Sequence, residues 1–401
     1  MKKGTIIVGS GRGLLFAKML TTTFKNLGHK VLAMVDINPT LHKTLRRRLD
    51  SYGAQDTLVL RTLGEALEKF GPEAADSVMV VASNTAHAEL ALETLNAKRH
   101  LFLEKPIAAN WDDAVTIANA VAASDLIVQL GFVLRYSAFY RKINEIVAAG
   151  KLGRIVTLQL NERLSLEHSN TYRRAWRRKQ SNTGGFINEK CSHDLDIICW
   201  LKKGQAVPVD IFSYGGRELF PSKPDAPKKC ADCPDKTCPF RYDRHKWDNK
   251  EFALNVDWDT QASCTFNTDA DVFNHQSIII RFSDGTQATL MAIAYSGDPN
   301  RDIIIHGTEG YIAGDLNAGA FSWVDYRTGE HKEISCNVKN DMHGGGDKSI
   351  ITEFFDCIAT GTQPFASVAD GLLASELAFA ADKSVKEGRK VALSEFNLNQ
   401  A

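Results

Sequence analysis

Short apolar runs alternate with helical patterns through the first 130 residues, and this alternation restricts the fold more than any other feature. The runs are apolar along nearly their whole length, which is typical of strands buried on both faces of a parallel sheet. We expect strands at 5–8, 30–35, 77–82, 100–103 and 126–130, and helices at 14–27, 41–51, 86–97 and 111–123. The sequence therefore predicts an α/β domain with a parallel sheet over residues 1–130.

The pattern changes after Gly153, where short strand-like segments follow one another with few helices between them. Ser283–Thr286 and Arg327–Glu330 have the composition of hairpin turns, which favours antiparallel pairing. The expected strands are 155–161, 209–214, 261–267, 277–282, 287–294 and 302–306, and the expected helices are 192–201, 350–359 and 368–387. We therefore expect a second domain over 131–401, of the α+β class with an open, mainly antiparallel sheet. A segment rich in Pro, Lys and Cys, at about 217–255, fits neither pattern and is interpreted as an insertion.

Composition excludes several classes of function. The 401 residues contain 48 Lys and Arg against 48 Asp and Glu, so no global field favours nucleic acid or an anionic membrane. No run approaches eighteen apolar residues, and the apolar run after Met1-Lys2-Lys3 is too short for an export signal. Eight cysteines, mostly scattered singly, are typical of a reducing compartment. We expect a cytoplasmic protein with no nucleic-acid or membrane partner.

A glycine-rich turn, Gly9-Ser10-Gly11-Arg12-Gly13, follows the first expected strand and opens the first helix. Glycines in that position let the backbone approach a dinucleotide pyrophosphate, which the helix N-terminus attracts. The third glycine comes one residue earlier than usual, with Leu14 in its place, and a plain turn is the alternative.

Asp36 ends the second expected strand, where a carboxylate binds the adenosine ribose hydroxyls. No arginine follows it to accept a 2′-phosphate, so NAD is favoured over NADP. The alternative is that Asp36 only caps the next helix.

Glu104-Lys105-Pro106 closes the expected strand 100–103. This position puts a lysine at the carboxyl edge of the sheet, where a nicotinamide ring would lie. Pro106 predicts a cis or sharply turned bond that presents Lys105.

With these residues in view, the chain resembles the glucose–fructose oxidoreductase/inositol dehydrogenase (Gfo/Idh/MocA) family. The resemblance rests on six motifs in the family's order: the glycine-rich turn with Asp36, then 83–87, 104–106, 131–136, 184–196 and 306–310. It implies a Rossmann domain followed by an open antiparallel sheet domain, with the active site between them. It also implies a sugar-like or cyclitol substrate and a homodimer or homotetramer formed through the sheet.

The resemblance places Lys105 and His193 on either side of the nicotinamide. A histidine titrates near neutrality and can take a hydroxyl proton, while a lysine can polarise the oxygen or act as the base if it is desolvated. Glu189 shares a helix face with His193, where the family commonly has Asp, and would orient His193 or bind a substrate hydroxyl. A purely structural His193 is the alternative. The residues expected to contact the cofactor are Gly9, Ser10, Gly11, Arg12, Gly13, Asp36, Ser83, Asn84, His87, Glu104 and Lys105.

Substrate contacts are expected from the second domain. Tyr172–Lys179 carries five cations in eight residues before Gly184-Gly185. It is interpreted either as a segment that binds an anionic substrate or as a solvated basic loop. His343–Asp347 is a flexible segment with polar ends, and it either supplies a pair of lid residues or is a plain loop. The candidate substrate residues are Arg135, Tyr136, Arg174, Trp176, Arg177, Lys190 and His343.

The expected insertion contains Cys230, Cys233 and Cys238 at a C-x2-C-x4-C spacing. Thiolates at this spacing can hold a structural zinc ion, which would order a segment with little core of its own. The fourth ligand would be His245 or Cys191, and reduced, unliganded thiols are the alternative.

Two enzymatic functions fit these residues. The first is an NAD-dependent oxidoreductase that moves a hydride to or from a secondary hydroxyl of a sugar, sugar acid or cyclitol. The alternative is an NAD-dependent glycoside hydrolase that acts by transient C3 oxidation and elimination, on an anionic glycoside if the basic segment binds it. A ligand-sensing regulator is a third class, which the retention of both Lys105 and His193 argues against.

Overall fold

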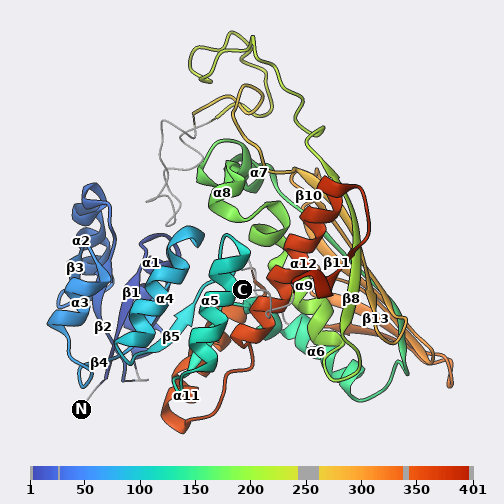
Figure 1. Ribbon diagram of the computed structural model, residues 1–401, viewed down its shortest axis with the longest axis horizontal. Coiled ribbons are helices and arrows are strands. Elements are labelled where there is room, and N and C mark those ends of the chain that lie inside the picture. Colours follow the sequence, from blue (N-terminus) through green and yellow to red (C-terminus); the bar gives the residue numbers. More distant parts are fainter. Residues whose placement is uncertain (1–2, 26–27, 243–261, 337–342, 397–401) are drawn as a thin grey trace. The chain divides into compact units, whose positions relative to one another are not determined.

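The computed structural model describes residues 3–25, 28–242, 262–336 and 343–396 (Figure 1). Among these residues the chain divides into two compact units. The first contains the chain up to Gly131 together with Ile351–Ala369, and the second contains most of the remainder. No helix in the described part of the chain is long and apolar enough to cross a membrane.

The first unit is built on a six-stranded parallel sheet with the order β3-β2-β1-β4-β5-β6. Its central strands are fully buried, as the continuous apolar runs predict. The strands are β1 (Gly4–Val8), β2 (Lys30–Val35), β3 (Leu58–Leu60), β4 (Ala75–Val80), β5 (His100–Leu103) and β6 (Val128–Leu130). The expected parallel α/β architecture is confirmed.

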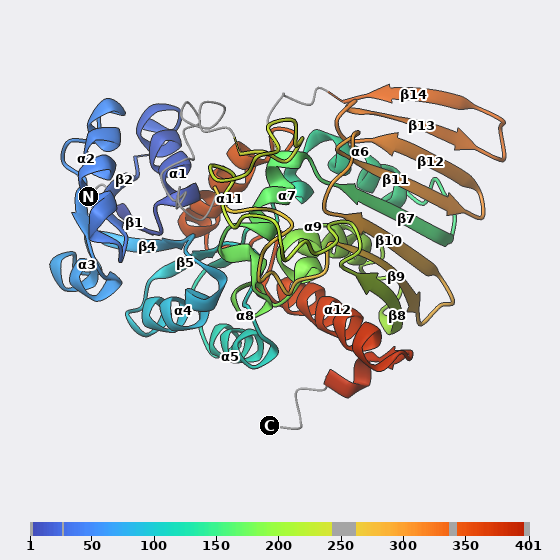
Figure 2. The same ribbon diagram turned by 90° about the horizontal axis from the view of Figure 1, so that it is seen from above.

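Helices cover both faces of this sheet: α1 and α2 lie on one face and α3, α4 and α5 on the other (Figure 2). They span α1 (Gly11–Thr22), α2 (His42–Ser51), α3 (Leu63–Lys69), α4 (His87–Asn96) and α5 (Trp111–Ala122). The sequence prediction missed β3 and α3. A signal for α3 was present, because Thr62 and Glu65 form a capping box at its start.

A late segment of the chain completes the first unit. Helix α11 (Gly346–Thr360) places Phe354 against Phe102 and stacks Phe355 on His29. Gln129 donates to Glu353 at 2.9 Å, and the amide of Leu130 donates to the carbonyl of Ala366 at 3.0 Å. The sequence prediction assigned this segment to the second domain, since contacts between residues so far apart leave no local signal.

The second unit contains a nine-stranded sheet with the order β14-β13-β12-β11-β7-β10-β9-β8-β15. All of its neighbouring strands pair antiparallel except β7 and β10, which pair in parallel, so the expected mainly antiparallel sheet is confirmed. The strands are β7 (Ile155–Arg163), β8 (Pro208–Gly216), β9 (His275–Phe282), β10 (Gln287–Ile293), β11 (Asn300–Gly307), β12 (Gly310–Asp315), β13 (Ala320–Asp325), β14 (His331–Ser335) and β15 (Val391–Ala392).

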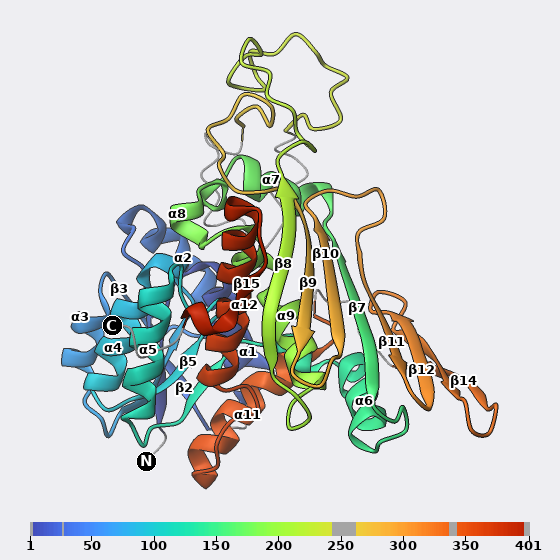
Figure 3. The same ribbon diagram turned by 45° about the vertical axis from the view of Figure 1, so that its right-hand side comes forward.

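Helices α6 (Ala138–Ala148), α9 (Phe186–Leu201) and α12 (Val368–Glu387) lie on one face of this sheet (Figures 2 and 3). Fifteen of the sixteen residues of α9 are buried, because the helix lies between the sheet and its neighbours; Ser375 of α12 donates to Asn188 of α9. Burial alternates along β9, so the other face of the sheet is open. Exposed apolar side chains on that face include Ile279 and Met291.

The segment between β8 and β9 departs from the prediction. A strand was expected at 261–267, but the described residues there form only an isolated bridge between Lys229 and Ser263. The described part of the expected insertion consists of turns and irregular backbone. Strands β12 to β15 and helices α6, α7 (Leu166–Arg173) and α8 (Gln180–Thr183) were not predicted.

Candidate active site

The glycine-rich turn lies at the carboxyl end of β1, and two of its glycines are required by close packing. Gly9 has φ of +101°, and a Cβ there would stand 2.6 Å from the carbonyl oxygen of Val81. A Cβ on Gly13 would stand 2.9 Å from both Ile7 and Met34. Gly13 thus brings α1 close to the sheet, the role usually held one position later, where Leu14 is instead a buried core residue. The early third glycine is therefore compatible with a dinucleotide turn.

Asp36 lies beside this turn at the carboxyl end of β2. Its carboxylate accepts hydrogen bonds from the backbone amides of Ser10 (3.1 Å) and Asn38 (2.9 Å). These bonds fix the carboxylate next to the turn. In a dinucleotide-binding domain such a carboxylate accepts the ribose hydroxyls, and its negative charge disfavours a 2′-phosphate.

Glu104 links the turn after β5 to the glycine-rich turn. One of its oxygens pairs with the guanidinium of Arg12 at 2.5 Å, and the other accepts the backbone amide of Lys105 at 3.0 Å. Glu104 is buried, and Gly131 leaves room for it, because a Cβ there would stand 3.0 Å from the carboxylate. The expected cis bond between Lys105 and Pro106 is confirmed.

His87 supports the same turn from α4. Its Nδ1 lies 3.0 Å from the carbonyl oxygen of Pro106 and 3.3 Å from that of Ile107. The ring is fully buried, and this burial lowers the pKa of His87. The structure therefore gives His87 a supporting role for the Lys105 turn, whereas its expected contact with the cofactor stays a prediction.

Asn84 begins a short 3-10 turn after β4, with Ser83 as its N-terminal cap. The Asn84 side chain is buried, and its Nδ2 has no hydrogen-bond partner among the described residues. A buried donor without a partner costs free energy unless a ligand satisfies it. Together with the Gly9 turn and the Asp36 carboxylate, this donor makes the first unit fit NAD.

In the second unit, His193 lies on α9 and faces two other rings. Its centroid is 5.9 Å from that of His343 and 6.0 Å from that of Phe132. The Nδ1 of His343 lies 2.9 Å from a carboxylate oxygen of Asp347. The structure thus brings together the two histidines that the sequence singled out separately and adds a carboxylate behind one of them. This arrangement can accept and hold a proton.

Glu189, four residues before His193, is engaged by the segment before α9. Its carboxylate accepts hydrogen bonds from the hydroxyl of Tyr172 and from Nε of Arg177, the latter at 2.6 Å. The guanidinium of Arg177 also stacks on Trp176, 4.6 Å from the ring centroid. Glu189 therefore anchors the basic segment to α9. Its expected contacts with His193 or a substrate hydroxyl stay predictions, as do the substrate contacts of Trp176, Arg177 and Tyr136.

Arg135 is engaged by two carboxylates of its own unit, and its expected contact with a substrate stays a prediction. Its guanidinium donates two hydrogen bonds to Asp196, at 2.7 and 2.5 Å, and pairs with Asp370 at 3.3 Å. Both Arg135 and Asp196 are 1% exposed. The pair joins the start of the second unit to α9 and α12, which is a structural role.

Two further expected substrate residues have other partners. Lys190 is buried and forms an ion pair with Glu162 at 3.2 Å. Arg174 is 1% exposed, donates to the carbonyl of Phe240, and lies 3.9 Å from the sulphur of Cys230. Both were assigned to the substrate from their position along the chain alone, and their partners lie on segments that the sequence could not place beside them.

The expected zinc site is not confirmed. Among the residues that the structure describes, no three His, Cys, Asp or Glu side chains lie close enough together to hold a metal ion as they stand. Cys191 is buried inside α9, where burial raises the pKa of its thiol, and His245 lies outside the described residues. All eight cysteines are free thiols.

The Rossmann-type sheet and its NAD-compatible turn define an NAD-binding oxidoreductase with a second, sheet-based domain. Residues 3–132 match the model of an oxidoreductase family with an NAD-binding Rossmann fold, and residues 144–393 match that family's C-terminal α/β domain. The chain therefore belongs to the Gfo/Idh/MocA oxidoreductase family and is an NAD-dependent dehydrogenase.

Individual relatives are distant in sequence. The chain is 24% identical over 348 residues to myo-inositol 2-dehydrogenase of Thermotoga maritima, covering 83% of this chain and 88% of that protein. It is 23% identical over 372 residues to the protein YteT of Bacillus subtilis, covering 85% of each. A solved levoglucosan dehydrogenase, in complex with NADH and levoglucosan, shares the fold with a TM-score of 0.76 at 15% identity, covering 98% of this chain and 100% of that one.

Proposed function

We propose that this dehydrogenase acts on a secondary hydroxyl of a cyclitol or sugar and uses NAD rather than NADP. The observation that carries the cofactor choice is Asp36, whose carboxylate is fixed beside the Gly9 turn by two backbone amides. The substrate class is supported by two relatives, one named myo-inositol 2-dehydrogenase and the other levoglucosan dehydrogenase.

Residues of the chain would accept the hydroxyl proton and bind the substrate oxygen. Gly9, Asp36 and Asn84 would hold NAD, which supplies the hydride acceptor when it is bound. His193 takes the proton of the substrate hydroxyl, and the ammonium group of Lys105 donates a hydrogen bond to the oxygen as it becomes a carbonyl. The imidazole of the His343–Asp347 pair has its centroid 5.9 Å from that of His193, and the pair would lie near the proton that His193 receives.

The glycosidase alternative gains no support from the basic segment. That interpretation used its cations to bind an anionic glycoside. Arg174 is instead engaged by Phe240, Arg177 by Glu189, and Arg178 by Asp269 at 2.6 Å. No observation in the described residues favours this function over the dehydrogenase.

The test is to incubate the purified protein with NAD and a panel of inositols, hexoses and anhydrosugars while following absorbance of the reduced nicotinamide. We expect NADH with at least one polyol and much less product when NADP replaces NAD. An aryl glycoside panel in the same buffer serves as the comparison. Release of aglycone that depends on NAD but leaves no NADH would contradict the proposal, as would a preference for NADP.

A further inference from the structure

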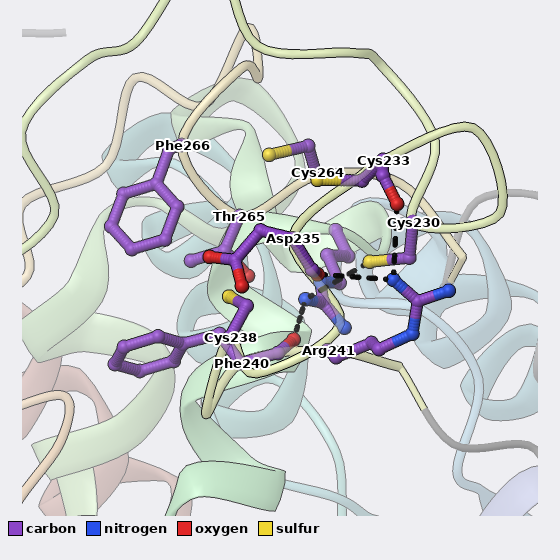
Figure 4. A pocket seen from close by; sticks show the side chains of 10 residues that line it. Cys230, Cys233, Asp235, Cys238, Phe240, Arg241, Cys264, Thr265 and Phe266 are labelled. Atoms are coloured by element: carbon purple, nitrogen blue, oxygen red, sulfur yellow. Dashed lines mark hydrogen bonds between the residues drawn. The ribbon is translucent and has the colours of Figure 1, made fainter.

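Four cysteines, rather than three, line one small pocket in the second unit. Cys230, Cys233 and Cys238 come from the segment after β8, and Cys264 comes from the segment that returns toward β9 (Figure 4). The pocket encloses about 20 Å³, which is close to the space needed for a single water molecule. A pocket of this size has room for a single ion.

Backbone hydrogen bonds hold the two cysteine-bearing segments together. The amide of Cys230 donates to the carbonyl of Ala262 at 2.8 Å, and the amide of Cys264 donates to the carbonyl of Lys228 at 2.7 Å. These bonds flank the bridge between Lys229 and Ser263. Cys230 and Cys264 are therefore placed diagonally across the bridge by main-chain contacts, which do not depend on any metal.

The first two cysteines lie on a tight turn. The amide of Asp232 donates to the carbonyl of Lys229 at 3.2 Å, and that of Cys233 donates to the carbonyl of Cys230 at 3.3 Å. A second turn carries Cys238, because the amide of Arg241 donates to its carbonyl at 3.0 Å. One turn thus presents Cys230 and Cys233 to the pocket and the other presents Cys238, a spacing that is compatible with a tetrahedral thiolate site.

The charge of the segment also matches such a site. Between Lys223 and Arg241 the sequence has five Lys and Arg residues and three Asp residues, a net charge of +2. Four thiolates around a divalent cation carry a net charge of −2, so the loaded segment would be neutral. In addition, the buried guanidinium of Arg174 lies 3.9 Å from the Cys230 sulphur.

We propose that Cys230, Cys233, Cys238 and Cys264 bind one structural zinc ion. The four thiols release their protons to solvent as they bind the metal. Side-chain rotation must bring the sulphurs together, since they line one pocket without yet lying at bonding distance from a common point. The metal fixes a segment whose other core is a small aromatic group in which Phe240 packs on Phe220, Phe266 and Tyr295.

A consequence concerns the candidate substrate segment. Arg174 follows directly after α7 and donates to the carbonyl of Phe240 beside the pocket. Arg173 donates to the carbonyl of Thr265 at 3.2 Å, next to Cys264. Zinc therefore holds the end of α7 in place through main-chain acceptors on both cysteine-bearing segments.

The experiment measures zinc in the full chain, purified under reducing conditions without chelator, by elemental analysis. We expect about one zinc per chain, as a tetrathiolate site requires. Cys264→Ser should reduce the content to background, whereas Cys336→Ser, which changes a half-buried cysteine at the end of β14, should leave it unchanged. A circular dichroism spectrum of the full chain close to that of the wild type shows that each variant is folded.

Cys238→His keeps a zinc ligand at the same position and should retain the metal, whereas Cys238→Ser should lose it. Cobalt in place of zinc should give thiolate-to-metal charge transfer and tetrahedral d–d bands that shift in Cys238→His. Full zinc content in Cys264→Ser would overturn the proposal, and so would a disulfide between any two of the four cysteines. Absence of zinc from the folded wild-type chain, even after incubation with excess zinc, would overturn it equally. None of these measurements needs a substrate, so failure here leaves the proposed dehydrogenase reaction untouched.

Discussion

At the scale of single residues, the turn that carries Lys105, the proposed hydrogen-bond donor to the substrate oxygen, is held by several neighbouring side chains. Lys105 itself was predicted from its position after β5, but the side chains around it have supporting roles. Glu104 binds the Lys105 amide and Arg12, while His87 binds the carbonyl of Pro106. A group that must act in one orientation needs such neighbours, because misplacement of about 1 Å can cost roughly 100-fold in rate.

Lys105→Met should lower kcat by about 10²- to 10⁴-fold, the usual contribution of a positioned proton-transfer group. Affinity for NADH should change little, because the turn at Gly9 and the carboxylate of Asp36 remain. The measurement pairs steady-state kinetics with a fluorescence titration of NADH. Lys142→Met, which removes an exposed lysine paired with Glu145, is the control and should leave both unchanged. Near-normal kcat in Lys105→Met would remove Lys105 from the mechanism.

Asp36→Ser should weaken NADH binding by roughly 10- to 100-fold, the equivalent of the 1.5–3 kcal/mol that hydrogen bonds to a charged group contribute. NADPH should bind better to this variant than to the wild type, because the repulsion of the 2′-phosphate is gone. Competitive titration of both cofactors checks this, and a melting temperature within a few degrees of wild type shows that the turn is intact. An unchanged preference between NADH and NADPH would show that Asp36 does not select the cofactor.

At the scale of elements, α9 is almost fully buried although it carries several charged side chains. Its charged side chains find partners on several other elements: Glu189 on the basic segment, Lys190 on β7, and Asp196 on the turn before α6. The sequence predicted the shared face of Glu189, His193 and Asp196 from their spacing. The partners could not be predicted, because ion pairs such as Arg135 with Asp370 join residues 235 positions apart.

Asp196→Ala should lower the free energy of unfolding by about 3–5 kcal/mol, since it leaves the buried guanidinium of Arg135 without its main partner. Urea denaturation followed by circular dichroism gives the value. The double variant Arg135→Met/Asp196→Leu removes both charges and should recover much of the loss. If the single substitution costs less than about 1 kcal/mol, as an exposed pair would, the pair is not the structural anchor described above.

Asp382 of α12 gives the second unit a dependence on pH. Burial raises its pKa to about 6, although its carboxylate accepts hydrogen bonds from Gln180 and Gln276. Its folded-state pKa thus lies above the unfolded value of about 3.9, so the folded chain binds the proton more tightly. This contribution to stability is present at low pH and is lost as pH rises from about 4 to 7.

Asp382→Asn should therefore flatten the change in unfolding free energy between pH 5 and pH 8, as measured by urea titrations at several pH values. Asp56→Asn, at an exposed turn, is the matched control and should keep the wild-type slope. A wild-type slope in Asp382→Asn would mean that the Asp382 carboxyl does not titrate in this range.

At the scale of the whole chain, the fold class was more predictable than its boundaries. Short apolar runs identified β1, β2 and β5 almost to the residue, because runs of four to six residues are too short for a helix and are typical of strands buried on both faces. The segment at 261–267 alternates apolar and polar residues like a strand, yet Cys264 and the backbone around it line the pocket and form a single bridge instead. Short edge elements such as β14 were missed because their side chains are mostly exposed and carry little pattern.

The open face of the nine-stranded sheet is predicted to be the surface through which chains associate. Large apolar patches are costly to leave in water, and Ile279, Met291 and Tyr214 are all exposed there. Ile279→Asp/Met291→Glu should shift the chain from an oligomer to a monomer in light scattering after size-exclusion chromatography. Val207→Asp changes an exposed apolar residue outside the strands and should not. A wild-type chain that is already monomeric at micromolar concentration would contradict the prediction.

The return of Ile351–Ala369 to the first unit has a consequence for the order of events during synthesis. The parallel sheet begins the chain, but the aromatic rings of Phe354 and Phe355 and the carbonyl of Ala366 that complete it come about 220 to 235 residues after Gly131. At about 5–20 residues per second, roughly 11 to 47 s of translation separate the two parts of that unit. A ribosome must therefore deliver eight of the nine strands of the second sheet, all except β15, before the cofactor domain, although it starts first, can finish folding.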